Sequence, residues 1–144
     1  MTEPQRGSEG LTDALAESAF MTMAVLSKAA ADNDLSLTQL RVLGILRDRR
    51  LRISALAGFL GLEKSTLSGL VDRAEKRGLL ARVPAPDDGR AVEIVMTPAG
   101  AALAERFHAD IRAALGPRTS ALTPAEQRRL QGLLEKMLRP NGLP

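Results

Sequence analysis

The sequence predicts a mainly α-helical fold that carries one small β-hairpin. Apolar residues recur at helical spacing through most of the 144 residues. The exception is a pair of short strand-like runs, residues 79–84 and 91–97, which are joined by the polar turn 85–90. The length suits one domain that is large enough to bury a core, so residues 1–144 are treated as a single domain.

The composition excludes several kinds of functional site. The chain has no cysteine, no tryptophan and no tyrosine, and it has one histidine and three phenylalanines. Disulfides and thiolate metal sites are therefore excluded, and no metal or other cofactor is expected. Few aromatic rings are available to stack on single-stranded nucleic acid. Neither a membrane span nor a secretory leader is evident, so a cytoplasmic protein without a membrane partner is expected.

Basic residues concentrate in one part of the chain. The formal net charge is only +3. Residues 47–90 contain ten basic and six acidic side chains, an excess of four, so the remainder is slightly acidic. This distribution suits a surface that binds nucleic acid, but an arginine-rich solvated surface would produce it equally well.

The N-terminal part predicts two helices. Residues 1–10 are polar and contain one proline and two glycines, which predicts a flexible tail. Residues 11–31 predict a long helix with an apolar stripe on one face. Residues 38–49 predict the next helix, capped by Ser36 or Thr38. Arginines at its end would complement the helix dipole.

A pair of shorter helices follows. Residues 51–53 predict a very short strand that pairs with the hairpin, and residues 54–60 and 63–77 predict helices joined by a turn at Gly61. Ser54 is placed to cap the first helix. The apolar face of the second helix consists of Leu67, Leu70, Val71 and Ala74. This arrangement is typical of a helix-turn-helix, although plain helical hairpins share it.

The hairpin follows directly. Gly78 is placed to end the second helix, and Pro84 and Pro86 predict that the first strand lies at an edge of the sheet. Gly89 suits a positive φ in the turn.

Two helices complete the chain. Thr97 and Pro98 are typical of a helix start, and Gly116-Pro117 of its end. Thr123 with Glu126 predicts a capping box at the start of the last helix.

This order of elements resembles the MarR family of winged helix-turn-helix transcriptional regulators. The most specific match is Asp88-Gly89-Arg90 followed by an alternating strand, which matches the D-x-R wing signature of the family. The segment LVDRAEKRGLL, residues 70–80, matches the usual end of its recognition helix. The resemblance covers almost the whole chain. It implies a DNA-binding lobe over residues 36–97 between dimerisation helices at 11–35 and 98–139.

The resemblance also implies a function. It predicts a homodimeric repressor that binds a pseudo-palindromic operator in double-stranded DNA and is released by a small aromatic or anionic ligand. No nucleophile–base set, metal cluster or phosphate loop is present, so an enzyme is not expected. The alternative is a winged-helix module that binds another protein and binds DNA weakly or not at all.

DNA contacts are expected from the exposed start of the recognition helix and from the wing. Arg90 at the hairpin tip suits an A·T-rich minor groove, although an ion pair with Glu63, Asp72 or Asp88 would also explain it. Asp88 and Gly89 are expected to order the wing. The predicted DNA contacts are Ser54, Lys64, Ser65, Thr66, Ser68, Arg73, Arg77 and Arg90.

Three of these contacts have a structural alternative. Ser65 could simply bond the helix start, and Arg73 and Arg77 suit phosphate or intramolecular partners better than bases. Gly69 departs from the family pattern, in which many relatives carry a longer polar side chain. A glycine inside a helix costs about 1 kcal/mol relative to alanine and removes one potential contact.

The ligand site is inferred by analogy with the family. The residues expected to approach it are Met21, Met23, Leu46, Phe107 and His108.

Overall fold

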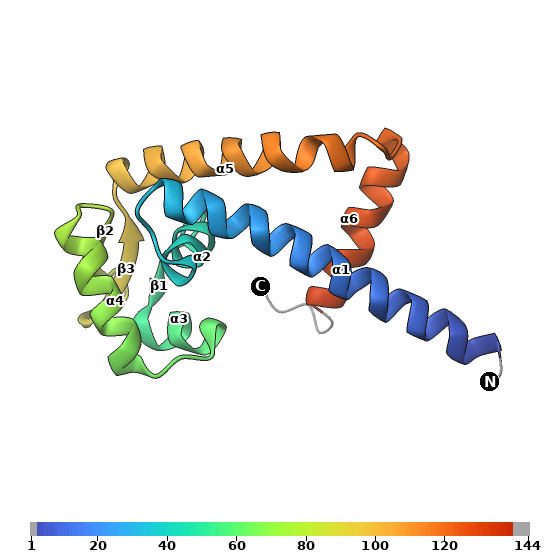
Figure 1. Ribbon diagram of the computed structural model, residues 1–144. Coiled ribbons are helices and arrows are strands. Elements are labelled where there is room, and N and C mark those ends of the chain that lie inside the picture. Colours follow the sequence, from blue (N-terminus) through green and yellow to red (C-terminus); the bar gives the residue numbers. More distant parts are fainter. Residues whose placement is uncertain (1–2, 140–144) are drawn as a thin grey trace. The chain divides into compact units, whose positions relative to one another are not determined.

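The computed structural model describes residues 3–139, which form six helices and a three-stranded sheet (Figure 1). The chain divides into two compact units, residues 1–111 and 112–144. The first unit contains α1 (Glu3–Asp32), α2 (Leu37–Ile45), β1 (Leu51–Arg52), α3 (Ile53–Leu60), α4 (Lys64–Lys76), β2 (Leu80–Ala85), β3 (Asp88–Met96) and the larger part of α5 (Pro98–Thr119). The second unit contains α6 (Pro124–Leu138) together with the end of α5.

Helix α1 begins earlier than the sequence predicted. Residues 3–10 are helical, so the expected flexible tail is wrong for this stretch, and residues 1–2 lie outside the described part. Pro4 falls in the first helical turn, where its missing N–H has no intrahelical partner to lose. The two glycines of the stretch lower helix propensity but do not end a helix.

Helix α2 is shorter than predicted. Ser36 forms its capping box with Gln39, but the helix ends at Ile45 instead of residue 49. The chain must leave the helix here because Leu51 pairs with Ile94 of β3. The arginines at 47, 49 and 50 therefore follow the helix, and the dipole does not explain them.

Helix α3 begins without the predicted serine cap. Its N-cap is Arg52, whose side chain makes no capping bond, and Ser54 lies exposed in the first turn. The cause is the strand before it, since Arg52 is still paired with Glu93 of β3 and the helix starts at once. Gly61 ends the helix with a φ of 64°, which confirms the predicted turn.

Helix α4 presents the predicted apolar face to the core. Its four inward residues, Leu67, Leu70, Val71 and Ala74, are all 5% exposed or less. The helix ends at Lys76 with Arg77 as its C-cap, and Gly78 follows with a φ of 74°. The N–H of Leu79 donates to the carbonyl oxygen of Ala74 at 2.9 Å, which is the bond expected at a glycine-ended helix.

The sheet is antiparallel in the order β1-β3-β2, so β2 is an edge strand, as Pro84 and Pro86 predicted. The hairpin turn is shorter than expected. Ala85 pairs with Asp88, which limits the turn to Pro86 and Asp87. Gly89 consequently belongs to β3, and it is not among the described glycines with positive φ. The expected left-handed conformation of Gly89 is wrong.

One hydrophobic core joins these elements in the first unit. Val42, Leu56, Leu67, Val71 and Ile94 are completely buried. Fully burying a side chain of this kind contributes roughly 1.5–3 kcal/mol. Figure 1 shows α4 beside the hairpin, with α3 adjoining it. The core therefore fixes the orientation of α4 and leaves its opposite face exposed.

A close contact sets the start of α5. The Thr97 hydroxyl donates to the carbonyl oxygen of Gly78 at 2.5 Å and accepts from the N–H of Gly100 at 3.0 Å. A Cβ at Gly100 would lie 2.1 Å from the carbonyl oxygen of Leu79, so only glycine fits here. The predicted start at Thr97 and Pro98 is confirmed.

The end of α5 differs from the prediction, whereas the start of α6 agrees with it. Helix α5 continues past Gly116 and Pro117 to Thr119, although proline was expected to end it. Proline removes one hydrogen bond, and the N–H of Ser120 still donates to the Gly116 carbonyl oxygen at 2.8 Å, so the last turn closes. Thr123 and Glu126 form the predicted capping box. The backbone hydrogen bond from Thr123 lowers the pKa of Glu126.

Candidate nucleic-acid interface

The start of α4 presents a polar, exposed surface. Lys64, Ser65 and Thr66 are exposed in its first turn. The N-cap residue Glu63 makes no side-chain bond to the helix, so the first N–H groups have no side-chain cap within the described chain. Such a helix start carries partial positive charge and suits an anion such as phosphate.

Ser68 is held by a residue that the sequence did not single out. The Arg82 guanidinium, which projects from β2, donates from Nη2 to the Ser68 hydroxyl at 3.3 Å. Its Nη1 lies 2.8 Å from Asp72 and 2.7 Å from Glu75. The sequence signal was available but weak: two acidic residues three apart on a helix, followed by an arginine in the next strand.

Arg73 covers the position at which Gly69 lacks a side chain. A Cβ built on Gly69 would lie 3.5 Å from Nη1 of Arg73, which is an ordinary contact distance. Gly69 is half-buried while Arg73 is exposed. The Arg73 guanidinium therefore lies on the outer face of α4 next to Gly69, where the glycine itself has no side chain.

Arg77 is engaged within the protein. Its guanidinium donates to the carbonyl oxygens of Asp34, at 2.6 Å, and Asn33, at 3.2 Å. Asp34 has a φ of 54°, which is uncommon for a residue other than glycine. Arg77 thus ties the end of α4 to the turn between α1 and α2. Of the two partners expected for Arg77, phosphate or a group within the protein, the structure has the second.

The wing presents Arg90 at its end. Arg90 is exposed, and its guanidinium makes no ion pair with any residue in the described part of the chain. Asp88 accepts the N–H of Arg90 on Oδ1 at 3.0 Å, the contact expected of a residue that orders the strand. Asp87 in the turn is instead paired with Arg52 of β1 at 3.2 Å.

Several other arginines of the basic region are paired with carboxylates. Arg47 lies 3.4 Å from Glu105, and Arg50 lies 2.8 Å from Glu93, whose side chain is only 16% exposed. Arg49 contacts Asp48 at 3.1 Å. The excess of basic residues in the sequence therefore overstates the charge that is available to a partner.

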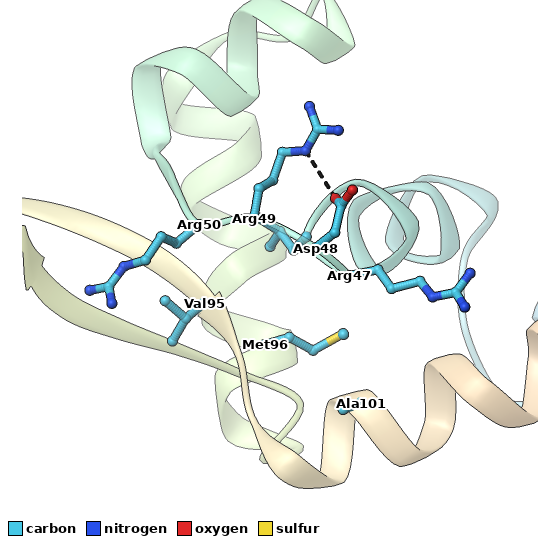
Figure 2. A pocket seen from close by; sticks show the side chains of 8 residues that line it. Arg47, Asp48, Arg49, Arg50, Val95, Met96 and Ala101 are labelled. Carbon is cyan, nitrogen blue, oxygen red and sulfur yellow. Dashed lines mark hydrogen bonds and ion pairs between the residues drawn. The ribbon is translucent and has the colours of Figure 1, made fainter. Parts of the chain in front are cut away.

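A surface cavity of about 420 Å³ opens beside the loop of residues 46–50, which joins α2 to β1 (Figure 2). Val95 and Met96 of β3 and Ala101 of α5 border it, while the guanidinium groups of the loop point away from one another. The full lining is Leu46, Arg47, Asp48, Arg49, Arg50, Val95, Met96 and Ala101. Leu46 is the one predicted ligand residue in this lining.

The other predicted ligand residues lie elsewhere. Phe107 is buried in the core, and Met21 and His108 are half-buried on α1 and α5. Met23 is exposed on α1.

Among residues 3–139 there is no group of three histidine or acidic side chains that could hold a metal ion. In the same range, no helix has the length and hydropathy that crossing a bilayer requires.

Comparison with known proteins identifies the family. A model of the MarR family matches residues 33–91. The multiple antibiotic resistance protein MarR of Salmonella typhimurium is 33% identical over 110 residues, which cover 73% of this chain and 74% of that protein. The HTH-type transcriptional repressor IacR of Pseudomonas putida is 31% identical over 103 residues. That match covers 71% of this chain but only 62% of the length of IacR.

A solved structure agrees with the arrangement. Bordetella bronchiseptica BpsR superposes with a TM-score of 0.66 at 28% identity, covering 88% of this chain and 91% of BpsR. The six helices and the small antiparallel sheet of the described residues match a winged-helix architecture. Proteins of this family are transcriptional regulators and not enzymes. The chain therefore belongs to the MarR family of winged-helix transcriptional regulators.

Proposed function

We propose that this protein is a cytoplasmic, homodimeric repressor that binds a specific sequence in double-stranded DNA. The observation that carries the proposal is the exposed Arg90 at the wing, without an ion pair in the described chain, on the same unit as the exposed start of α4. The helix start suits the major groove, and an arginine on a hairpin suits the narrow minor groove of A·T-rich DNA.

Exposed apolar side chains support a dimer. In the first unit, Leu11 and Phe20 of α1 are 60% and 79% exposed. In the second unit, α6 has no buried residue, and Leu133 and Met137 are more than half exposed. Apolar helix faces of this kind are usually covered by a partner. A two-fold dimer would place two recognition helices about 34–36 Å apart, one turn of DNA, and would read a pseudo-palindrome.

Release by a small aromatic or anionic ligand is the regulatory part of the proposal. The solved structure of BpsR is described as a mechanism for regulation of DNA binding by 6-hydroxynicotinic acid. A ligand of similar chemistry would release DNA from this protein only if it bound better to a dimer with a different spacing of recognition helices.

The test measures binding to the duplex upstream of the protein's own gene. Fluorescence anisotropy of the labelled duplex gives the affinity at each concentration of a salt series. Affinity should fall steeply with salt, and Arg90→Ala should weaken binding at least tenfold because a minor-groove contact is lost. Arg41→Ala, which removes an exposed arginine on α2 outside the predicted DNA contacts and the predicted dimerisation helices, is the matched control and should bind as the parent does. Binding that does not respond to salt, or equal loss in both variants, would contradict the proposal.

The ion pairs within the basic region favour one alternative, a winged-helix module that recognises a protein partner. Arg47, Arg50 and Arg52 are all engaged with carboxylates. Failure to bind any duplex, including one selected from a random library, would favour this alternative over a repressor.

A further inference from the structure

Arg82 makes three kinds of contact with one face of the recognition helix. Its Nη1 forms ion pairs with Asp72 and Glu75, and its Nη2 donates to the carbonyl oxygen of Ser68 at 3.4 Å and to the Ser68 hydroxyl oxygen at 3.3 Å. Its own backbone N–H donates to the second carboxylate oxygen of Glu75 at 3.2 Å. The side chain is only 28% exposed. The guanidinium therefore has a fixed position between β2 and α4.

This position determines how the Ser68 hydroxyl can bond. A serine hydroxyl has one hydrogen to donate and two lone pairs that accept. The guanidinium can only donate, so it occupies a lone pair of Ser68 and leaves the hydrogen unused. Serines inside helices often donate that hydrogen to the carbonyl four residues earlier, but no such bond to Lys64 is present among the described contacts.

Resting on the proposed function, we propose that Arg82 is a positioning residue that makes Ser68 a hydrogen-bond donor toward the major groove. Guanine, thymine and adenine each present an acceptor there, whereas cytosine presents only its amino donor. A serine whose orientation is free tolerates all four bases, because its hydroxyl can donate or accept. A serine held by Arg82 should disfavour cytosine at the base that it faces.

The test measures base preference, which a purely structural role would leave unchanged. Wild-type protein, Ser68→Ala, Arg82→Lys and the double variant select from a random 30-base-pair duplex library, and the bound pools are sequenced. Lysine keeps a positive charge for Asp72 and Glu75 but lacks the second donor that reaches Ser68. Arg82→Lys should lose about fivefold discrimination against cytosine at the same position as Ser68→Ala, and the double variant should lose no more than either single variant.

Asp72→Asn is the control for the stability of this contact network. It weakens an ion pair of Arg82 without removing the contact to Ser68, so it should lower the Tm and leave base preference unchanged. If Arg82→Lys reduces binding to every sequence by one factor, or changes a position that Ser68→Ala does not change, the inference is overturned while the repressor function stands. If the wild-type protein enriches no sequence, the proposed function itself fails.

Discussion

Gly100 packs against the carbonyl oxygen of Leu79 so closely that a Cβ at this glycine would lie 2.1 Å from that oxygen and 2.8 Å from Cγ of Met96. The contact seats the start of α5 on the segment that links α4 to β2. Gly100→Ala should destabilise the fold by roughly 1–3 kcal/mol, since either backbone must shift. Chemical denaturation measures this change.

Gly58→Ala serves as the control for that substitution. Gly58 lies within α3, and an added Cβ would have no neighbour within 4 Å. Alanine should raise stability here by about 0.5–1 kcal/mol. A Gly100→Ala variant as stable as the parent would show that the start of α5 can move away from Leu79.

Gly69→Ala should stabilise the protein rather than damage it. The added Cβ meets only Nη1 of Arg73 at 3.5 Å, and alanine favours a helix interior by about 1 kcal/mol. The Tm should rise by a few degrees, and DNA affinity should change less than threefold because Arg73 keeps its place. A large loss of affinity at unchanged Tm would instead mean that the glycine admits the DNA backbone closely.

Arg77→Ala should affect stability more than DNA binding. The guanidinium supports the carbonyl oxygens of Asp34 and Asn33, and losing these exposed bonds should cost about 1 kcal/mol. Denaturation and duplex titration on the same preparations separate the two effects. Asp34→Gly is the companion variant: it should raise stability, because glycine adopts a φ of 54° without strain. A tenfold loss of affinity in Arg77→Ala would contradict this assignment.

The start of α6 should weaken in acid. The hydrogen bond from Thr123 lowers the pKa of Glu126 below its ordinary value of 4.5. A carboxyl whose pKa is lower in the folded state stabilises the fold above its unfolded pKa, and that stability is lost as the pH falls through the folded pKa. Helix content followed by circular dichroism from pH 6 to pH 3 should therefore fall less in Glu126→Gln, whose amide keeps the capping bond at every pH. Equal acid sensitivity in both proteins would assign the effect to other carboxylates.

Local signals in the sequence predicted most of the fold. The inward face of α4, the glycine ends of α3 and α4 and the start at Thr97 depend on neighbouring residues, so spacing and capping rules found them. The predicted end of α2 was wrong because Leu51 pairs with Ile94, 43 residues away, and this pairing decides where the helix stops.

The candidate site was predictable where exposure alone defines it, as for Lys64 and Arg90. It was not predictable where a long-range partner decides the role of a side chain. Arg77 contacts a turn 43 residues earlier, and Arg82 reaches back 14 residues to Ser68. An arginine in a sequence gives no indication of whether a carbonyl oxygen, a carboxylate or a phosphate will accept its hydrogens.

The ion pairs of Arg47, Arg50 and Arg52 also bear on the kinetics of encounter. Beyond a Debye length, about 8 Å at physiological ionic strength, each pair is nearly neutral. Long-range attraction should therefore accelerate association with DNA only modestly. The association rate constant should lie near the roughly 10⁵–10⁷ M⁻¹s⁻¹ that is typical without electrostatic steering. The contacts of Lys64 and Arg90 should then act mainly on the residence time, so this protein would find a site slowly and differ among sites by how long it stays.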